Sequence, residues 1–467
     1  MPLDLARILS ERASEKYALH DRYLNAQMVQ MLRLIGYDVD FVRAEGAYLI
    51  DAKGERYLDL LGGFGVFALG RNHPTVIDAL RQLLDARLAN LVQMDVSLLA
   101  GLLAERLLPH LPGMERIYFC NSGTEAVEGA IKFARMATGR SRILYCDHAF
   151  HGLTYGALSL NGDAAFRDGF GPLLPACDQV PFDDLPALER ALAAGDVAAF
   201  VVEPIQGKGV NLPSDDYLPG AARLCRKYGA LFVADEIQTG MGRTGRFLAL
   251  DHWQVEPDIV LLAKALSGGF VPVGAIAMRA WIFARMFDRM DRAMVHGSTF
   301  GENDMAMTAG LATLEAMAEE RLVERAAHAG ERLLAALAPL ATRYDLVKSV
   351  RGKGLMIGIE FGAPKSLSLK AAWTLLNTVN ESLFCEMITI PLFQRHRVLS
   401  QVSGHNTVIK LIPPLVLSDA DCDWASEAFD QVIADCQHVT GAAWDLGRSL
   451  MSHALEAHSA TPEIKPA

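Results

Sequence analysis

Short, continuous apolar runs alternate with longer stretches of helical character from about residue 98 onward. Runs without polar interruption are typical of strands that are buried on both faces. Most of the separations between the runs suit helical crossovers, so we predict an α/β fold built on a large, mostly parallel mixed sheet. The runs that define this sheet are 117–120, 143–146, 197–202, 231–234, 259–263 and 273–278.

The flanking parts of the chain have a different pattern. We expect a helix around 25–34, and a hairpin in which strands 42–50 and 56–59 flank a turn at 51–54. A long helix at 306–320 leads into a final region with further strands at 354–361 and 408–412. The predicted domains are an N-terminal segment that forms part of a small domain (1–97), a large domain (98–330), and a C-terminal small α+β domain (331–467) whose tail, from about Ser459, is disordered.

The composition is that of an ordinary globular protein, with 51% hydrophobic and 21% charged residues in a chain of 467. A net charge of −11 argues against a surface that binds nucleic acid or an anionic membrane. The seven cysteines form no CxxC pair and have no metal-ligand spacing, which favours reduced thiols in a cytoplasmic protein without a metal site. Residues 1–23 have no apolar core, and no run reaches the roughly 18 residues of a spanning helix, so we expect neither a signal peptide nor a membrane anchor.

Polar residues follow directly after most of the predicted strands. In open α/β sheets, ligands bind outside the carboxyl ends of the strands. We therefore expect these polar residues to meet in one crevice. They are the stretches 121–126, 147–152, 203–207 and 235–240, together with Lys264.

Lys264 and Asp235 are the two most informative of these residues, because each closes an apolar run. Burial lowers the pKa of a lysine and makes its amine nucleophilic, and such lysines form Schiff bases with carbonyls, including that of pyridoxal phosphate (PLP). A carboxylate at the end of a buried strand also needs a cationic partner, and a protonated pyridine nitrogen would serve. The alternative is that Lys264 is a solvated loop residue, as most lysines after strands are.

Other residues in the crevice have two possible roles each. Ser122, Gly123 and Thr124 precede a helix that we expect to start near Glu125, where they either bind a phosphate or form an ordinary N-cap. Phe150 either stacks on an aromatic ring or belongs to the pocket wall.

His151, Glu203 and Gln238 are equally open. His151 could be a satisfied structural histidine, and Glu203 a buried hydrogen-bonding anchor. Gln238 could donate to a phenolic oxygen or serve the turn. The loop 296–301 offers small donors for a second phosphate contact, or is simply a turn.

Taken together, the motifs resemble the class III aminotransferases, PLP enzymes of fold type I. The resemblance extends from about Arg43 to Asp421 and is carried by SGTEA, FHG, EPIQG, DEIQTGMGRTG, LLAKALSGG, HGSTFGEN, RGKGL and IPPL. Within the class, RAEGAYL and YLDLLGGFGVFALGRNHP look most similar to the putrescine aminotransferase branch. The ornithine and acetylornithine aminotransferases look like near cousins.

The resemblance implies roles for individual residues. Lys264 would hold PLP as a Schiff base and move the proton during catalysis, and Asp235 would pair with the pyridinium nitrogen. Gln238 would contact the ring hydroxyl. The remaining cofactor-binding candidates are Phe150 and Ile237 on the two faces of the ring, Ser122, Gly123 and Thr124 at the phosphate with Thr299 of the neighbouring subunit, and His151 and Glu203.

The candidate substrate-binding residues are Phe64, Lys208 and Lys410. Many members of the class have a glutamate at the position of Lys208 and an arginine at that of Lys410. In those proteins the arginine grips the substrate carboxylate, and the glutamate neutralises it while the second substrate binds. Two lysines cannot make that switch, and lysine lacks the bidentate fork of arginine.

We therefore predict a PLP-dependent transaminase with ping-pong kinetics. It would pass an amino group from an amine, a putrescine-like diamine or an ω-amino acid to a 2-oxo acid, acting as a homodimer or higher oligomer without nucleic-acid or membrane partners. Alternatives are an ornithine or acetylornithine aminotransferase, or an aminomutase, decarboxylase or racemase on the same scaffold. A nucleotide-binding protein is disfavoured because no GxGxxG or GxxxxGK[ST] pattern follows the early strands.

Overall fold

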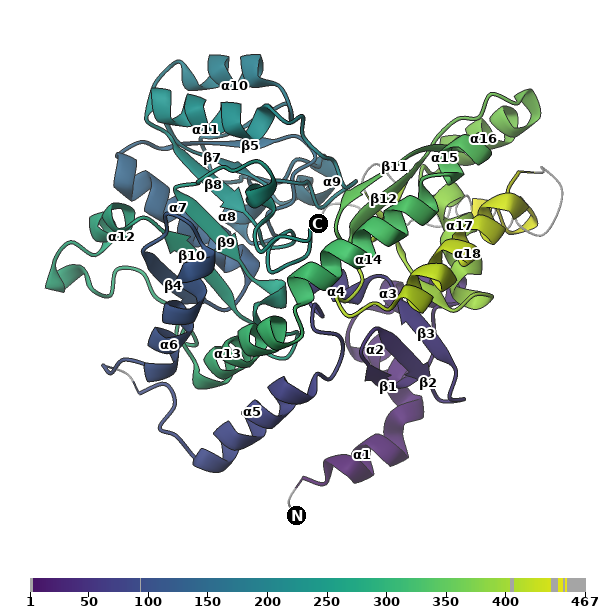
Figure 1. Cartoon of the computed structure of the whole chain (residues 1–467), viewed down its shortest axis with the longest axis horizontal. Helices are drawn as coiled ribbons and strands as arrows, with labels where there is room; N and C mark the ends of the chain where they lie inside the picture. Colours follow the sequence, from purple (N-terminus) through teal and green to yellow (C-terminus); the bar gives the residue numbers. More distant parts are fainter. Residues whose placement is uncertain (1–2, 93, 404–406, 438–443, 448–449, 452–467) are drawn as a thin grey trace, which may run out of the picture.

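The computed structural model describes residues 3–92, 94–403, 407–437, 444–447 and 450–451. Its centre is a seven-stranded sheet with the order β4-β10-β9-β8-β7-β5-β6 (Figure 1). The strands in this order are β4 (Arg116–Cys120), β10 (Gly274–Met278), β9 (Ile259–Leu262), β8 (Leu231–Asp235), β7 (Val197–Val202), β5 (Arg142–Cys146) and β6 (Cys177–Val180). Each apolar run of the sequence has become a strand of this sheet.

The strand directions confirm the predicted mostly parallel mixed sheet. β10 is antiparallel to both of its neighbours, β4 and β9, while β9, β8, β7, β5 and β6 pair in parallel. Because β10 is antiparallel to both neighbours, β4 and β9 point in the same direction. The strand β6 was not predicted, because its central residues Asp178 and Gln179 are exposed at the edge of the sheet.

Helices cover both faces of the sheet, which explains why the strands are apolar throughout. Along β7, Ala199 and Val201 face the core under α7 (Gly123–Thr138), whereas Phe200 and Val202 face the core under α10 (Leu185–Leu192) and α11 (Tyr217–Tyr228). Side chains of a strand alternate between faces, so burial on both sides requires an unbroken apolar run.

Other helices complete this part of the molecule. The long helix predicted at 306–320 is α13 (Asp304–Glu319), which packs on α5 (Pro74–Ala86) and α6 (Leu98–Leu107). The remaining short helices are α4 (Gly62–Gly65), α8 (Tyr155–Leu158), α9 (Ala164–Arg167) and α12 (Ala280–Met286).

Two four-stranded sheets lie beside the central one (Figure 1). The first contains β1 (Phe41–Glu45), β2 (Tyr48–Asp51), β3 (Arg56–Asp59) and β13 (Val398–Leu399). The second contains β11 (Val347–Lys353), β12 (Met356–Phe361), β15 (Val408–Leu411) and β14 (Gln401–Ser403). Because β13 pairs in parallel with β3, residues from both halves of the chain share one sheet.

The hairpin formed by β2 and β3 agrees with the prediction, but the single strand expected at 42–50 was wrong. It is divided into β1 and β2, which pair antiparallel around Gly46 and Ala47. Gly46 has φ of +55°, a left-handed conformation that reverses the chain and that glycine adopts without steric cost. The helix expected at 25–34 is α3 (Ala26–Leu34), with the Asn25 side chain as its N-cap.

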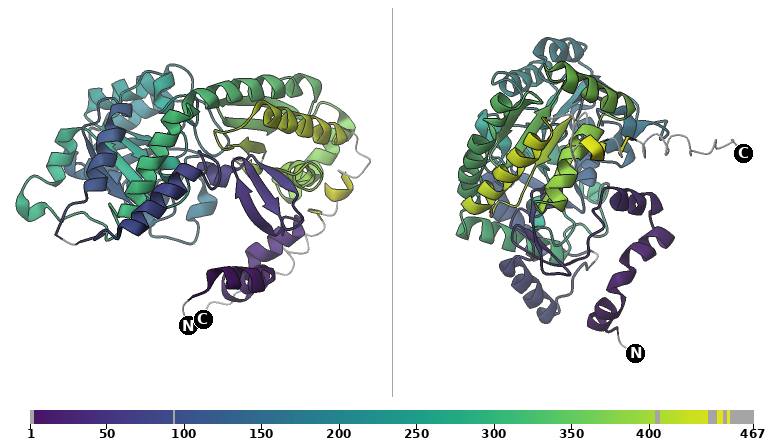
Figure 2. Two further views of the ribbon diagram at one scale, coloured as in Figure 1. Left: turned by 60° about the horizontal axis from the view of Figure 1, so that its bottom comes forward. Right: turned by 90° about the vertical axis from the view of Figure 1, so that its right-hand side faces the viewer.

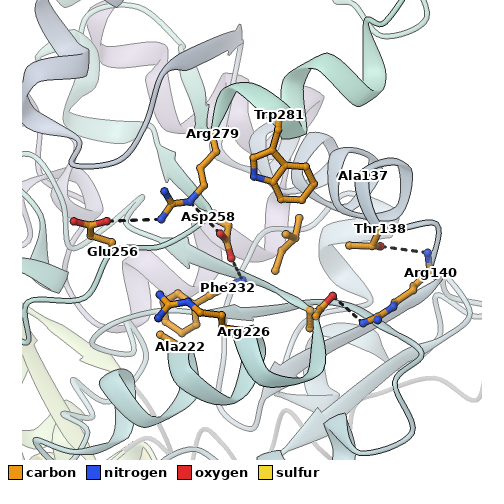
Figure 3. A pocket seen from close by; sticks show the side chains of 13 residues that line it. Ala137, Thr138, Arg140, Ala222, Arg226, Phe232, Glu256, Asp258, Arg279 and Trp281 are labelled. Carbon is orange, nitrogen blue, oxygen red and sulfur yellow. Dashed lines mark hydrogen bonds and ion pairs between the residues drawn. The ribbon is translucent and has the colours of Figure 1, made fainter.

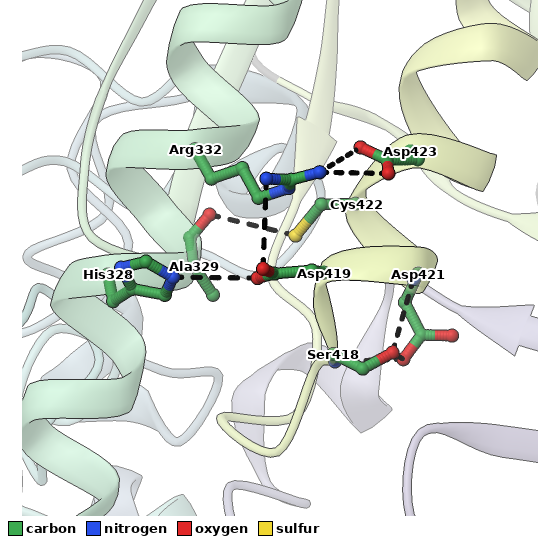
Figure 4. A network of polar contacts seen from close by, with 8 residues as sticks. All are labelled: His328, Ala329, Arg332, Ser418, Asp419, Asp421, Cys422 and Asp423. Atoms are coloured by element: carbon green, nitrogen blue, oxygen red, sulfur yellow. Dashed lines mark hydrogen bonds and ion pairs between the residues drawn. The ribbon is translucent and has the colours of Figure 1, made fainter.

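Helices from the second half of the chain flank the sheet formed by β11, β12, β15 and β14. They are α14 (Leu322–Leu337), α15 (Leu340–Arg343), α16 (Leu367–Val379), α17 (Leu383–Gln394) and α18 (Asp419–Asp435). Figure 4 shows a polar network between α14 and α18, in which Arg332 contacts both carboxylate oxygens of Asp423 at 2.7 and 2.8 Å. The two helices also pack together, and Leu333 of α14 and Phe429 of α18 belong to the same buried apolar cluster.

The first helices, α1 (Leu5–Arg12) and α2 (Lys16–Tyr23), bury none of their residues and extend away from the body of the chain (Figure 2). Within the described residues, no helix has both the length and the apolar character needed to cross a membrane. The tail predicted from Ser459 lies outside the described residues.

Candidate functional site

Polar residues at the carboxyl ends of several central strands contact one another, as the sequence predicted. The backbone N–H of Phe150, which follows β5, donates to Glu203 Oε1 after β7 at 2.9 Å. His151 Nδ1, also after β5, lies 2.6 Å from Asp235 Oδ2 at the end of β8. These strands are parallel, so their carboxyl ends meet at one edge of the sheet, and three of the predicted clusters join there.

Asp235 and His151 form a buried pair at the centre of this site, with 3% and 2% of their surfaces exposed. The second carboxylate oxygen, Oδ1, accepts the N–H of Ile237 at 3.1 Å, which fixes the orientation of Asp235. Burial alone lowers the pKa of His151, but the hydrogen bond and charge of Asp235 and the charge of Glu203 outweigh it, so the pKa is raised. Among the described residues, His151 Nε2 is buried without a hydrogen-bond partner.

Lys264 follows β9 and has the environment expected of a nucleophile. Burial lowers the pKa of its ammonium group, while the charges of Asp235 and Glu203 act in the opposite direction. The structure gives Nζ no hydrogen bond and no ion pair within the residues it describes. Lys264 also has φ of +43°, an uncommon left-handed conformation for a residue with a side chain. Such strain is typical of functional sites.

Glu203 is buried and accepts two backbone N–H groups, from Phe150 at 2.9 Å and from Gly207 at 2.7 Å. Burial raises the pKa of this carboxyl group, and the charge of Asp235 acts in the same direction. Its contacts are those of an anchor that holds two loops of the site together, the role that the sequence left open.

The geometry at the N-terminus of α7 is compatible with both roles predicted from the sequence, an ordinary N-cap and a phosphate site. Ser122 Oγ accepts the N–H of Glu125 at 3.2 Å and so forms an ordinary N-cap, which moves the helix start to Gly123, two residues before the predicted one. A Cβ on Gly123 would lie 3.0 Å from the Ile237 side chain, a tight contact to which Ile237 would have to adjust. Thr124 Oγ1 lies 2.7 Å from Thr154 Oγ1. The free backbone N–H groups of this helix end are suited to an anion.

The three candidate substrate-binding residues are placed differently. Gln238 Nε2 donates to the backbone oxygen of Phe64 at 3.1 Å, and Gln238 Oε1 accepts from Lys410 Nζ at 3.2 Å. Phe64 and Lys410 are therefore linked through Gln238. The Lys208 ammonium group does not join them, because it lies 2.6 Å from Asp163 Oδ2. The two lysines thus have separate partners.

Thr299 and Phe150 lie at the edge of the site. Thr299 is exposed in this chain, while its neighbour Ser298 accepts a hydrogen bond from Asn121 Nδ2 at 2.6 Å, which places the loop next to the end of β4. The Phe150 ring packs edge-on against Phe166, with 5.5 Å between the ring centroids.

The sequence analysis missed the polar and aromatic residues that support the site from outside the strand ends. Asp163 and Phe166 belong to a segment without a motif, and only their contacts with Lys208 and Phe150 reveal their position. Glu236 could have been noticed, since it lies within DEIQTG. It is buried and accepts the N–H groups of Ala249 and Leu250 at 3.0 and 2.9 Å, which holds the loop after β8.

A cavity of about 550 Å³ lies at the opposite edge of the sheet, where β8 begins (Figure 3). Its lining includes Leu231, Phe232 and Trp281, and Arg279 Nε donates to Asp258 Oδ1 at 3.1 Å across it. None of the predicted site residues lines this cavity. It is therefore separate from the cluster around Lys264.

Comparisons with known proteins agree with this geometry. Residues 35–433 match the family described as aminotransferase class-III. The aminotransferase PigE of Serratia sp. is 37% identical over 447 residues, a match that covers 88% of this chain and 52% of that protein, so the chain spans about half the length of this relative.

Two solved structures are similar over most of the chain. An ornithine aminotransferase from Toxoplasma gondii is 30% identical with a TM-score of 0.76, and the match covers 90% of this chain and 97% of that one. An amine transaminase from an uncultivated Pseudomonas species, solved in its PLP-bound form, is 30% identical with a TM-score of 0.74, covering 85% and 95%. With its mixed α/β sheet and its match over residues 35–433, the chain belongs to the class III aminotransferases, PLP-dependent enzymes of fold type I.

Proposed function

We propose that the protein is a transaminase that moves an amino group from an amine, a putrescine-like diamine or an ω-amino acid to a 2-oxo acid in a ping-pong reaction. The observation that carries the proposal is the Lys264 amine, which has no hydrogen bond or ion pair among the described residues. It follows β9, the direct neighbour of the strand β8 that ends in the buried Asp235. Burial lowers the pKa of this amine, which favours its nucleophilic neutral form.

The residues at this site fit PLP. Lys264 offers a reactive amine, Asp235 a buried acid for a cationic ring nitrogen, and the start of α7 backbone donors for a phosphate. The missing Cβ of Gly123 keeps open the space next to Ile237. When bound, PLP supplies an aldehyde that condenses with amines and a ring that accepts electrons from the substrate Cα.

Each of the surrounding residues would have its own role in binding the cofactor or in moving the proton. Lys264 Nζ would hold the cofactor and later take the proton from the substrate Cα. Asp235 would keep the ring nitrogen protonated, and His151 would orient Asp235 through their 2.6 Å contact. Glu203 would anchor the loop that carries Phe150.

We propose further contacts to the cofactor, which the family membership supports. Phe150 and Ile237 would lie on the two faces of the ring, and Gln238 would reach the ring hydroxyl. Ser122, Gly123 and Thr124 would bind the phosphate at the start of α7.

A homodimer would complete the phosphate site with Thr299 of the second subunit. Exposed apolar side chains in the segments that contain Thr299 and residues 94–96 support such an interface, because a monomer leaves few of them in contact with water. Met290 is 96% exposed and Phe300 62%, and Met94 and Val96 are 90% and 87% exposed. We also infer a cytoplasmic location, which the free state of the seven cysteines supports.

The amino donor could also be ornithine or acetylornithine, since ornithine aminotransferases are among the similar structures. A screen of diamines, ω-amino acids and α-amino acids, following the loss of the yellow cofactor colour, would rank the donors. Faster bleaching by putrescine than by ornithine supports the diamine assignment, whereas activity with ornithine alone would replace it.

The central test concerns Lys264. The purified protein with PLP should be yellow, and borohydride reduction followed by peptide mass spectrometry should place the cofactor on Lys264. Lys264→Ala should lower the transfer rate by about a thousandfold or more, because it removes the attachment point and the proton carrier. Lys227→Ala is the matched control, since this exposed lysine pairs with Glu189 and Tyr228 on the outer surface. A Lys264→Ala protein with the wild-type rate would end the proposal.

A further inference from the structure

The two lysines at the substrate side of the site differ in how their charges are compensated. Lys208 Nζ lies 2.6 Å from the Asp163 carboxylate and 4.1 Å from the centre of the Phe166 ring. An acid and an aromatic face are both favourable partners for an ammonium group. Lys208 is also held away from Lys410 by these contacts.

Lys410 on β15 has no such compensation, although only 4% of its surface is exposed. Its Nζ donates to the backbone oxygen of Gly207 at 2.9 Å and to Gln238 Oε1 at 3.2 Å, and both acceptors are neutral. No carboxylate forms an ion pair with Lys410 in the part of the chain that the structure describes. An ammonium group has three donors, so one is left for a further acceptor.

The contacts of Lys410 place that donor beside residues that we assign to the cofactor and the substrate. Gln238, its hydrogen-bond partner, also binds the backbone of the exposed Phe64. Lys410 also bonds to the backbone oxygen of Gly207, the residue whose N–H binds the buried Glu203 at 2.7 Å. The spacing is tight, because a Cβ on Gly207 would come within 2.5 Å of Gln238 Oε1.

Burial and the surrounding charges together favour the neutral form of Lys410. Burial is the largest effect, and the charges of Lys264, Lys208 and Arg243 act in the same direction, while Glu203 opposes them. Together they lower the pKa of Lys410 to about 7. An arginine in this place would stay charged at every physiological pH.

We propose that Lys410 selects the reaction partner through its proton: as an ammonium group it binds the carboxylate of a 2-oxo acid or amino acid, and as a neutral amine it admits amines and aldehydes without a carboxylate. This inference rests on the proposed function and names its two substrate classes. One site then serves both halves of the reaction without the glutamate and arginine found in many members of the class. The proton itself is exchanged with solvent.

The first test compares two acceptors of equal chain length, pyruvate and propanal. In the wild type, the ratio of their kcat/KM values should be highest at pH 6 and fall by up to about tenfold per pH unit above 7, because only the ammonium form binds the carboxylate. Lys410→Arg should give a high ratio that does not change with pH. Lys410→Met should give a ratio about 10- to 100-fold lower at pH 6, also without pH dependence. A wild-type ratio that is constant between pH 6 and 9 would overturn the inference.

A second measurement does not depend on turnover. Propionate binding to the holoenzyme can be followed by calorimetry at pH 8 in buffers of different ionisation enthalpy, which reports the protons taken up. The wild type should take up close to one proton per propionate, whereas Lys410→Arg should take up none. Equal uptake by both proteins would show that another group titrates. Because propionate binding needs no amino transfer, this result stands even if the proposed reaction fails.

Lys208→Met sharpens the assignment. The substitution removes the positive charge of Lys208, which favours the neutral form of Lys410. The pH midpoint of the pyruvate-to-propanal ratio should therefore move to higher pH. Lys227→Met, a loss of a distant exposed lysine, should leave the midpoint in place. A midpoint that moves equally in both variants would contradict a local effect on Lys410.

Discussion

The two ends of the central strands differ in how fully their polar groups are hydrogen-bonded. At the amino edge, Asp258 accepts the N–H of Phe232 at 2.9 Å and Arg279 Nε at 3.1 Å, and Arg140 Nη1 donates to several backbone carbonyls. At the carboxyl edge, Lys264 has no partner among the described residues and His151 Nε2 is buried without one. The first arrangement stabilises the fold, whereas the second leaves reactive groups with shifted pKa values, as functional sites do.

The largest expected effect is at the carboxyl edge. Asp235→Asn removes the buried negative charge but keeps the size of the side chain and one hydrogen-bond acceptor. Because the acid stabilises charge that develops during the reaction, kcat should fall by about 100- to 1,000-fold, while the urea midpoint changes little. Steady-state kinetics and urea unfolding measure the two outcomes. An equal loss of stability and activity would mean that Asp235 is mainly structural.

The amino edge should give the reverse result. Asp258→Ala leaves the Phe232 N–H and the Arg279 guanidinium without their acceptor, so unfolding should become easier by about 1–3 kcal/mol. The kcat of the folded protein should stay at the wild-type value, since no predicted site residue contacts Asp258. Urea unfolding followed by fluorescence is the measurement. A large fall in kcat with unchanged stability would contradict the assignment of Asp258 to stability alone.

A smaller effect is expected from the pH dependence of stability. Lys410 has a pKa of about 7 in the folded chain and an ordinary value near 10.4 when unfolded. Between these values the unfolded chain binds more protons, so wild-type stability should rise with pH relative to Lys410→Met, by at most about 1.4 kcal/mol per pH unit. Urea unfolding of both holoenzymes at pH 7.5 and 9 tests this. Parallel pH profiles would show that Lys410 titrates normally.

The smallest effect is predicted for the surface network in Figure 4. Arg332 contacts Asp423 and Asp419 on α18, but both carboxylates are exposed and Arg332 is only partly buried. Water and salt screen such pairs, so Arg332→Ala should leave both the urea midpoint and kcat unchanged within error. A clear shift of the midpoint would mean that ion pairs, and not the buried apolar residues, hold α14 to α18.

The sequence predicted the carboxyl edge well because each strand there is a continuous apolar run that ends in polar residues. It could not predict the partners of those residues. His151 and Asp235 lie 84 positions apart, and only the order of the strands brings them together. The direction of β10 was also hidden, since an apolar run has the same composition in either direction. Lys208 paired with Asp163 because of the fold of an intervening segment that has no motif.

The pairing of β13 with β3 has a consequence for how the protein is made. Leu58 and Val398 are direct partners in this parallel ladder. The edge of β3 therefore stays unpaired until several hundred further residues have been translated. Contacts between such distant positions form slowly, and an open strand edge can pair with another chain in the meantime. Production of the protein should therefore depend on the rate of synthesis and on chaperones that shield the nascent N-terminal sheet.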